Sequence, residues 1–333
     1  MRALKTIASI SSIVLLVAAR STATNQTQGP ETPLGPPCAL TFTLAQELPE
    51  NAATADAVDE PPSPVPPFTI SAHGHTPLLM SEIAADLYVV TGSGGNVAVR
   101  VTSEGVVLVD NKSAQNQGAL LGCVARVTDR PVRYVIGTHH HDDHMGGNKP
   151  LANSARVRVL AHKNMRANMM AEKQPAPPAV VFTKKTSLFL GNATIEVHHF
   201  GNGHTNGDAV VLFPELDVLH AGDLFVDGLP FIDYANGGNS ADWVDTLGGI
   251  LSLDFETVIP GHGPLMTKRD VQAFRDRFVT LRTRMTQLIY RGVTKEQARA
   301  QLETTDLQWT LAPNSLFVRQ SFADFYDELL GER

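Results

Sequence analysis

The chain has 333 residues, of which 43% are apolar and 18% charged, so it can form one large domain or two modest ones around a substantial core. Acidic residues outnumber basic residues by 34 to 27, which gives a formal net charge of −7. This balance, without any run of Lys and Arg, argues against binding to nucleic acid or to an anionic membrane surface. Only two cysteines are present, too few for a cysteine metal cluster.

The first 23 residues have the pattern of a signal peptide. Arg2 and Lys5 give a positive start, residues 7–19 form a short apolar core, and residues 21–23 form a small-residue cleavage motif. The apolar stretch is shorter than the roughly 20 residues that span a bilayer, and no cysteine follows it to carry a lipid. We therefore expect a secreted or periplasmic protein without a stable membrane anchor.

Residues 24–67 differ in composition from the rest of the chain. They contain ten of the 21 prolines, several acidic residues and no basic residue, so we expect a disordered linker. Cys38 lies in this segment, and it could form a disulfide with Cys123 or remain a free thiol. The folded domain is expected over residues 68–333.

From residue 68 onward, short apolar runs alternate with helical patterns. The runs predict strands at residues 87–90, 97–101, 106–109, 132–136, 156–161, 194–198, 209–213, 218–221 and 257–259. Helical spacing predicts helices at residues 114–127, 163–173, 241–251, 270–291, 295–302 and 321–330. This order predicts an α/β (α+β) fold in which helices cover the sheets.

A dense group of histidines and aspartates directly follows the strand predicted at residues 132–136. In an extended segment His139 and His141 point the same way, so both can bind one metal ion. Asp143 and His144 stand where the chain turns, and they are expected to point toward a second ion. Imidazole and carboxylate ligands suit zinc, with iron or manganese as alternatives.

Three later residues stand in turns or at strand ends and could complete this set. His204 precedes a predicted strand and would supply a third nitrogen to the first ion. Asp223 follows another strand, and its two oxygens could bridge the two ions. His262 follows the last predicted strand and would complete the second ion's ligands.

In this order, the motifs resemble those of the metallo-β-lactamase fold superfamily over residues 84–264. The His-x-His-x-Asp-His signature matches residues 139–144, and further motifs match at residues 203–205, 222–223 and 261–263. The resemblance implies a four-layered αββα sandwich, with additional C-terminal helices from about residue 270. It also implies seven metal ligands: His139, His141, Asp143, His144, His204, Asp223 and His262.

The resemblance further implies a metal-dependent hydrolase that binds two zinc ions per chain. A hydroxide that bridges the two metals would attack an ester, lactone, thioester, phosphoester or amide bond, β-lactams included, in a small-molecule substrate. Asp143 is the candidate catalytic residue, because it could orient the hydroxide and pass a proton to the leaving group. Asp110 matches an aspartate that the family often keeps beside the site. The loop at residues 226–240 is expected to line the pocket.

Two features separate this chain from the β-lactamases that have cysteine at the bridging position and lysine three residues later. Asp223 and Val226 occupy these positions here. Two alternatives to a zinc hydrolase remain at this point: a mononuclear iron enzyme similar to persulfide dioxygenases, and a non-catalytic metal-binding module. The substrate and the oligomeric state are left open.

Overall fold

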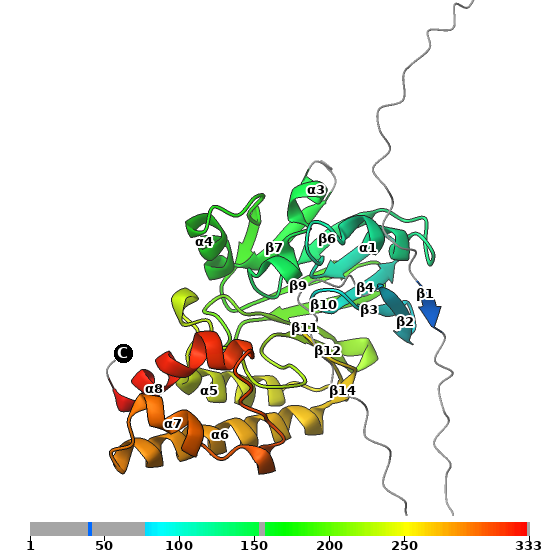
Figure 1. Cartoon of the computed structure of the whole chain (residues 1–333). Helices are drawn as coiled ribbons and strands as arrows, with labels where there is room; N and C mark the ends of the chain where they lie inside the picture. Colours follow the sequence, from blue (N-terminus) through cyan, green and yellow to red (C-terminus); the bar gives the residue numbers. More distant parts are fainter. Residues whose placement is uncertain (1–38, 42–76, 153–156, 332–333) are drawn as a thin grey trace, which may run out of the picture. The chain divides into compact units, whose positions relative to one another are not determined.

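The computed structural model describes residues 39–41, 77–152 and 157–331 (Figure 1). The predicted signal peptide, Cys38 and nearly all of the predicted linker lie outside these residues, so the predicted domain boundaries stay predictions. Three residues of the linker segment, Ala39–Thr41, form strand β1, which pairs in parallel with Leu79–Ser81.

The described residues form two β-sheets. The larger sheet holds eight strands in chain order: β1, β2 (Leu79–Ala84), β3 (Leu87–Thr91), β4 (Val97–Thr102), β5 (Gly105–Val109), β6 (Val132–Ile136), β7 (Arg158–His162) and β8 (Val180–Phe182). The smaller sheet has the spatial order β14, β13, β12, β11, β10, β9. Its strands are β9 (Lys185–Leu190), β10 (Ala193–His198), β11 (Val210–Phe213), β12 (Val218–Gly222), β13 (Thr257–Pro260) and β14 (Met266–Thr267).

Helices cover the outer face of each sheet (Figure 1). On the side of the larger sheet lie α1 (Gln117–Val124), α2 (Asp142–Met145), α3 (Asn148–Ala152) and α4 (Lys163–Ala171). On the side of the smaller sheet lie α5 (Ser240–Leu251), α6 (Lys268–Tyr290), α7 (Lys295–Gln301) and α8 (Phe322–Leu330). Shorter turns are 3₁₀ segments at Pro214–Leu216, Tyr234–Asn236 and Thr305–Leu307 and a π-helical turn at Phe317–Ser321. The expected αββα sandwich is confirmed.

Three clusters of buried apolar side chains fill the three spaces between these four layers. Strand β5 shows how the layers arise, because all five of its residues are buried. Val106 and Leu108 pack in the cluster shared with α1, whereas Val107 and Val109 pack in the cluster shared with the smaller sheet. Since successive strand residues point to opposite faces, a continuous apolar run is what a strand covered on both sides requires.

The third cluster lies between the smaller sheet and α5, α6 and α8. Trp243 and Phe274 are among its fully buried side chains. The long helix α6 begins with a capping box at Thr267 and Asp270, in which each residue's side chain accepts a hydrogen bond from the other's backbone N–H. Among the described residues, none of the helices is both long and apolar enough to cross a membrane.

Two parallel strand pairs determine where the functional residues gather. β5 pairs in parallel with β6, and β12 pairs in parallel with β13. Because parallel neighbours end at the same edge of a sheet, the segments after these strands emerge side by side. Asp110, His139, Asp223 and His262 all stand in these segments, directly after the four strands or two to three residues beyond them.

Candidate metal centre

The structure brings the seven predicted ligands together at this edge. One group joins His139, His141 and His204, and a second joins Asp143, His144 and His262. Asp223 groups with His139 and His144. Within each group the candidate ligand atoms lie within 4.8 Å of one another. The residues therefore form two adjoining groups that share one carboxylate.

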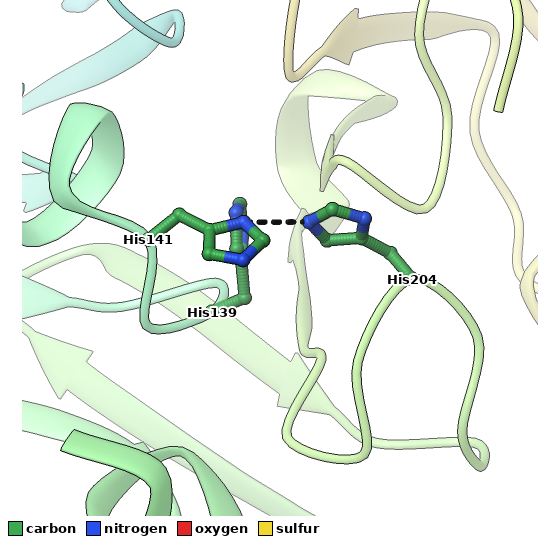
Figure 2. Close-up of side chains that lie close together, drawn as sticks. All are labelled: His139, His141 and His204. Carbon is green, nitrogen blue, oxygen red and sulfur yellow. Dashed lines mark hydrogen bonds between the residues drawn. The ribbon is translucent and has the colours of Figure 1, made fainter. Parts of the chain in front are cut away.

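The first group, His139, His141 and His204, is called the three-histidine group here (Figure 2). His139 and His141 come from the segment after β6, and His204 comes from the turn before β11. Figure 2 shows the imidazole of His141 facing that of His204, with His204 Nε2 2.9 Å from His141 Nδ1. The His139 ring centroid lies 4.8 Å from that of His141 and 4.6 Å from that of His204.

Outer hydrogen bonds decide which nitrogens of these rings carry lone pairs. His204 Nδ1 lies 2.6 Å from the carbonyl oxygen of Phe231, which can only accept, so this nitrogen carries the proton. His141 Nε2 lies 3.0 Å from Asp233 Oδ2 and donates to it. In neutral rings, His204 Nε2 and His141 Nδ1 therefore face each other with two lone pairs, an arrangement that calls for a cation between them.

The ring of His139, the third of this group, also has a lone pair on its inner nitrogen. Thr138 Oγ1 donates its hydrogen to Asp110 Oδ2 at 2.8 Å, so toward His139 Nδ1, at 3.0 Å, it can only accept. His139 Nε2 consequently carries a lone pair. This atom is buried and has no hydrogen-bond partner among the described residues. Buried polar atoms are nearly always paired, so an unpaired acceptor beside two others fits a metal ligand.

The second group combines two histidines with the carboxylate of Asp143, and Asp223 lies beside it. His144 Nδ1 donates to Asp110 Oδ2 at 2.7 Å, which leaves its Nε2 free to face the group. That Nε2 lies 3.2 Å from Asp223 Oδ1, and His262 Nε2 lies 3.2 Å from Asp143 Oδ2. Asp110 is fully buried and adopts a left-handed backbone conformation with φ of 63°. Its position agrees with the family resemblance, which implies an aspartate beside the site here.

Asp223 lies between the two groups. Its Oδ2 is 3.5 Å from His262 Nε2 and 3.7 Å from His204 Nε2. One carboxylate thus reaches ligand atoms of both groups, which is the placement that a bridging ligand requires.

The two groups differ in electrostatic character. Burial lowers the pKa of His204 to about 4 and holds that of His139 well below its usual value. Both rings are therefore neutral at pH 7, and each can offer a lone pair to a metal ion. Burial alone would also lower the pKa of His262, but Asp223 and Asp143 raise it to about 9. Asp143 and the shared Asp223 therefore favour positive charge beside the second group.

Phe231, in the loop at residues 226–240, places an apolar ring beside two of the candidate ligands. The ring of Phe231 stacks on that of His141 with centroids 5.7 Å apart and an interplanar angle of 21°. The same ring meets His204 edge-on at 5.3 Å. An apolar part of a substrate could therefore lie against Phe231 beside the candidate ligands.

Sequence reasoning missed several residues that support the site. Asp233 and the Phe231 carbonyl stand in a loop without a spacing pattern, and Thr138 looks like an ordinary residue after a strand. Lys112 was also missed. It is fully buried beside this edge, its Nζ makes no hydrogen bond to a described residue, and burial lowers its pKa to about 7.

Comparison with known proteins agrees with this geometry. The family model described as "Metallo-beta-lactamase superfamily" matches residues 90–262, just over half of the chain. The chain belongs to this superfamily. Members of the metallo-β-lactamase superfamily are mostly metal-dependent hydrolases, and the His and Asp groups described above could hold metal ions.

Individual relatives cover only part of this chain. A metallo-beta-lactamase type 2 from Bacillus cereus is 30% identical over 174 residues, which cover 50% of this chain and 66% of that relative. A metallo-beta-lactamase structure from Pontibacter korlensis superposes with a TM-score of 0.55 at 22% identity, over 60% of this chain and 98% of that one. The structure of a double mutant of the sec-alkyl sulfatase PisA1 superposes with a TM-score of 0.64 at 16% identity, over 76% of this chain and 50% of that one. At these identities the superpositions concern the fold alone.

Proposed function

We propose that this member of the metallo-β-lactamase superfamily is a dinuclear zinc hydrolase. The observation that carries the proposal is the pair of facing nitrogens, His141 Nδ1 and His204 Nε2, 2.9 Å apart with their other ring nitrogens already bound to acceptors. His139 would complete the first zinc site. Asp143, His144 and His262 would hold the second ion, and Asp223 would bridge the two.

Each residue would have a distinct part in catalysis. Zinc ions held there would acidify a water molecule and polarise the bond under attack. Asp143 has 44% of its side chain exposed, so its carboxylate could orient the attacking water and carry a proton to the leaving group. Phe231 would hold the apolar part of the substrate against the site.

The residues beside the candidate ligands support a substrate class. We infer an ester, lactone, thioester or amide bond in a small molecule with an apolar portion. Val226 stands where lysine-bearing β-lactamases would place a cation for the substrate carboxylate. A neutral lactone or ester therefore suits this pocket better than a β-lactam. The β-lactam remains in the test panel because of the activity named for the Bacillus cereus relative.

We also infer that the protein is exported to the periplasm or secreted. The support is the charged start, apolar core and small-residue motif of residues 1–23. Mass spectrometry of the mature N-terminus, after expression of the full chain, tests this inference. Retention of Met1 in the mature protein would contradict it.

Metal analysis and turnover together test the proposed function. Elemental analysis of the purified protein should find about two zinc ions per chain. Hydrolysis across a panel of lactones, esters, thioesters and β-lactams should stop on chelation and return with zinc. His204→Gln should lose zinc, whereas His198→Gln should not, because His198 pairs with Glu196 and belongs to none of the candidate metal-binding groups among the described residues. One iron per chain, with oxygen uptake on persulfides, would overturn the proposal.

A further inference from the structure

Three consecutive residues of the loop before α5 support two candidate ligands. The Phe231 carbonyl accepts from His204 Nδ1, and Asp233 Oδ2 accepts from His141 Nε2. The N–H of Asp233 also donates to the His204 carbonyl at 2.9 Å. Ile232, fully buried, stands between these two residues. The backbone position of Ile232 therefore contributes to the placement of both acceptors, together with the bonds that Asn236 and Gly238 donate to Asp233.

One side chain from a distant segment holds Ile232. The Ser321 hydroxyl accepts from the Ile232 N–H at 2.9 Å and donates to the Ile232 carbonyl at 2.9 Å. Ser321 is itself fully buried, and it stands 89 residues along the chain from Ile232. A single hydroxyl thus satisfies both backbone polar groups of a residue that has no strand or helix partner.

Ser321 is the last residue of the π-helical turn Phe317–Ser321, which leads into α8. Such turns insert one extra residue into a helix, and they recur at functional positions. Helix α8 holds the same loop at a second point. The Glu328 carboxylate accepts from the Tyr234 hydroxyl and from the N–H groups of Ser240 and Ala241. The loop is therefore tied to a helix that lies beyond the family-matched residues 90–262.

We propose that Ser321 is a positioning residue for the three-histidine group, acting through Ile232 on the acceptors of His141 and His204. The inference rests on the proposed function, since it assumes that this group binds zinc. It implies that the C-terminal helices of this chain adjust one zinc site and leave the other unchanged, because no described hydrogen bond links Ser321 or Ile232 to Asp143, His144 or His262.

Without the hydroxyl, the buried N–H and carbonyl of Ile232 lose their partners, and the loop must move to find others. Phe231 and Asp233 would move with it, and the rings of His204 and His141 would lose their orientation. Replacing the outer partner of a metal-bound histidine lowers metal affinity about 10–100-fold. Ser321 acts one residue further out, so we expect the lower end of that range.

The test compares Ser321→Ala with Ser315→Ala. Ser315 is a matched control, because its hydroxyl also binds one carbonyl and one N–H, but both belong to its own segment, at Ala312 and Val318. Competition with a chromophoric zinc chelator gives the two stepwise dissociation constants. The variants His204→Ala and His262→Ala assign each step to its group. Ser321→Ala should weaken the three-histidine site about tenfold and leave the other within twofold, and Ser315→Ala should change neither.

A second measurement needs no metal. Nitrogen-15 NMR of the metal-free protein reports which ring nitrogen of each histidine carries the proton. Ser321→Ala should change the signals of His141 and His204 and spare those of His144 and His262. Should Ser321→Ala not fold, Ser321→Cys keeps the shape of the side chain, with a somewhat larger atom that forms only weak hydrogen bonds, and the same selective change is expected.

The outcomes separate the two proposals. Unchanged zinc affinity together with unchanged signals of His141 and His204 in the Ser321 variants overturns the positioning role alone. Equal weakening of both zinc sites overturns it as well, because it shows a general loss of structure. A wild-type protein that binds no zinc at either group overturns the proposed function and this inference together.

Discussion

His144 Nδ1 donates to Asp110 Oδ2 at 2.7 Å, and both side chains are fully buried. The same carboxylate also accepts from the N–H and the hydroxyl of Thr138. Asp110 therefore sets the proton position on His144 directly and on His139 through Thr138. One buried acid governs a histidine in each of the two groups.

Asp110→Asn should weaken zinc binding at the group that contains His144. The amide NH₂ can donate to Nδ1, which would move the ring proton to Nε2 and block the ligand atom. We expect about 10–100-fold weaker binding, measured by chelator competition. Asp217→Asn is the matched control, because Asp217 is exposed but shares the left-handed backbone conformation. Equal zinc affinity in the two variants would contradict the role of Asp110.

Asp223→Ala should reduce the zinc content to one ion per chain or fewer and abolish turnover. The reason is that its carboxylate reaches ligand atoms of both groups. Elemental analysis after gel filtration measures the content. Asp227→Ala, an exposed aspartate four residues later, should retain both ions. Two zinc ions and full activity in Asp223→Ala would remove the bridging assignment.

Gly95→Ala should disrupt the site without adding any charge. Gly95 lies in the turn between β3 and β4, and a Cβ there would run into the buried His144 ring. Moving that ring should cost about 1–3 kcal/mol of unfolding free energy and lower zinc content. Gly118→Ala, in helix α1 with open space around it, should leave stability unchanged or slightly higher. Thermal unfolding of both variants measures this difference in stability. An unfolding curve and zinc content for Gly95→Ala equal to those of the wild type would contradict the close contact.

Lys112→Met should stabilise the metal-free fold, most strongly at low pH. Burial lowers the pKa of Lys112 to about 7, against about 10.4 in an unfolded chain. Between these two pH values the folded chain binds fewer protons than the unfolded chain. The buried ammonium therefore lowers the free energy of unfolding most below pH 7, and this loss becomes smaller as the pH rises toward about 10.

Urea unfolding of Lys112→Met at pH 6 and pH 9.5 measures this effect. We expect a gain of about 1–3 kcal/mol at pH 6 and a smaller one at pH 9.5. Lys149→Met, at an exposed lysine, is the control and should show little change at either pH. A destabilised Lys112→Met would mean that the ammonium supports the fold.

Local patterns predicted much of the fold and the centre of the site. The apolar runs predicted β3 to β6, and β5 shows the reason most clearly, because a strand covered on both faces consists almost entirely of apolar residues. The same reasoning failed for β9 (Lys185–Leu190), most of whose residues are only half-buried or exposed, so that Lys and Thr interrupt its apolar pattern. Strands β2, β8 and β14 were missed as well, the last having only two residues.

The residues of the site also divide into those that the sequence predicts and those that it does not. Residues 139–144 lie within one turn, so their spacing alone suggests a shared ion. His204, Asp223 and His262 could be added because each stands in a turn or at a strand end. Asp233 and Ser321 could not, since their contacts depend on how a long loop meets a helix 89 residues further on. No periodic pattern of residues in the sequence indicates such a contact.

The parallel pairing of β12 with β13 links metal uptake to the order of folding. Parallel neighbours need a crossover, and here it runs through α5 before Thr257 pairs with Val218. This long-range closure is slow compared with local contacts. Asp223 and His262 meet only after it is complete, whereas His139 to His144 are adjacent from the start. A chain in which β12 and β13 have not yet paired would thus bind metal ions weakly. Tight binding of a second zinc ion would therefore indicate that folding is complete.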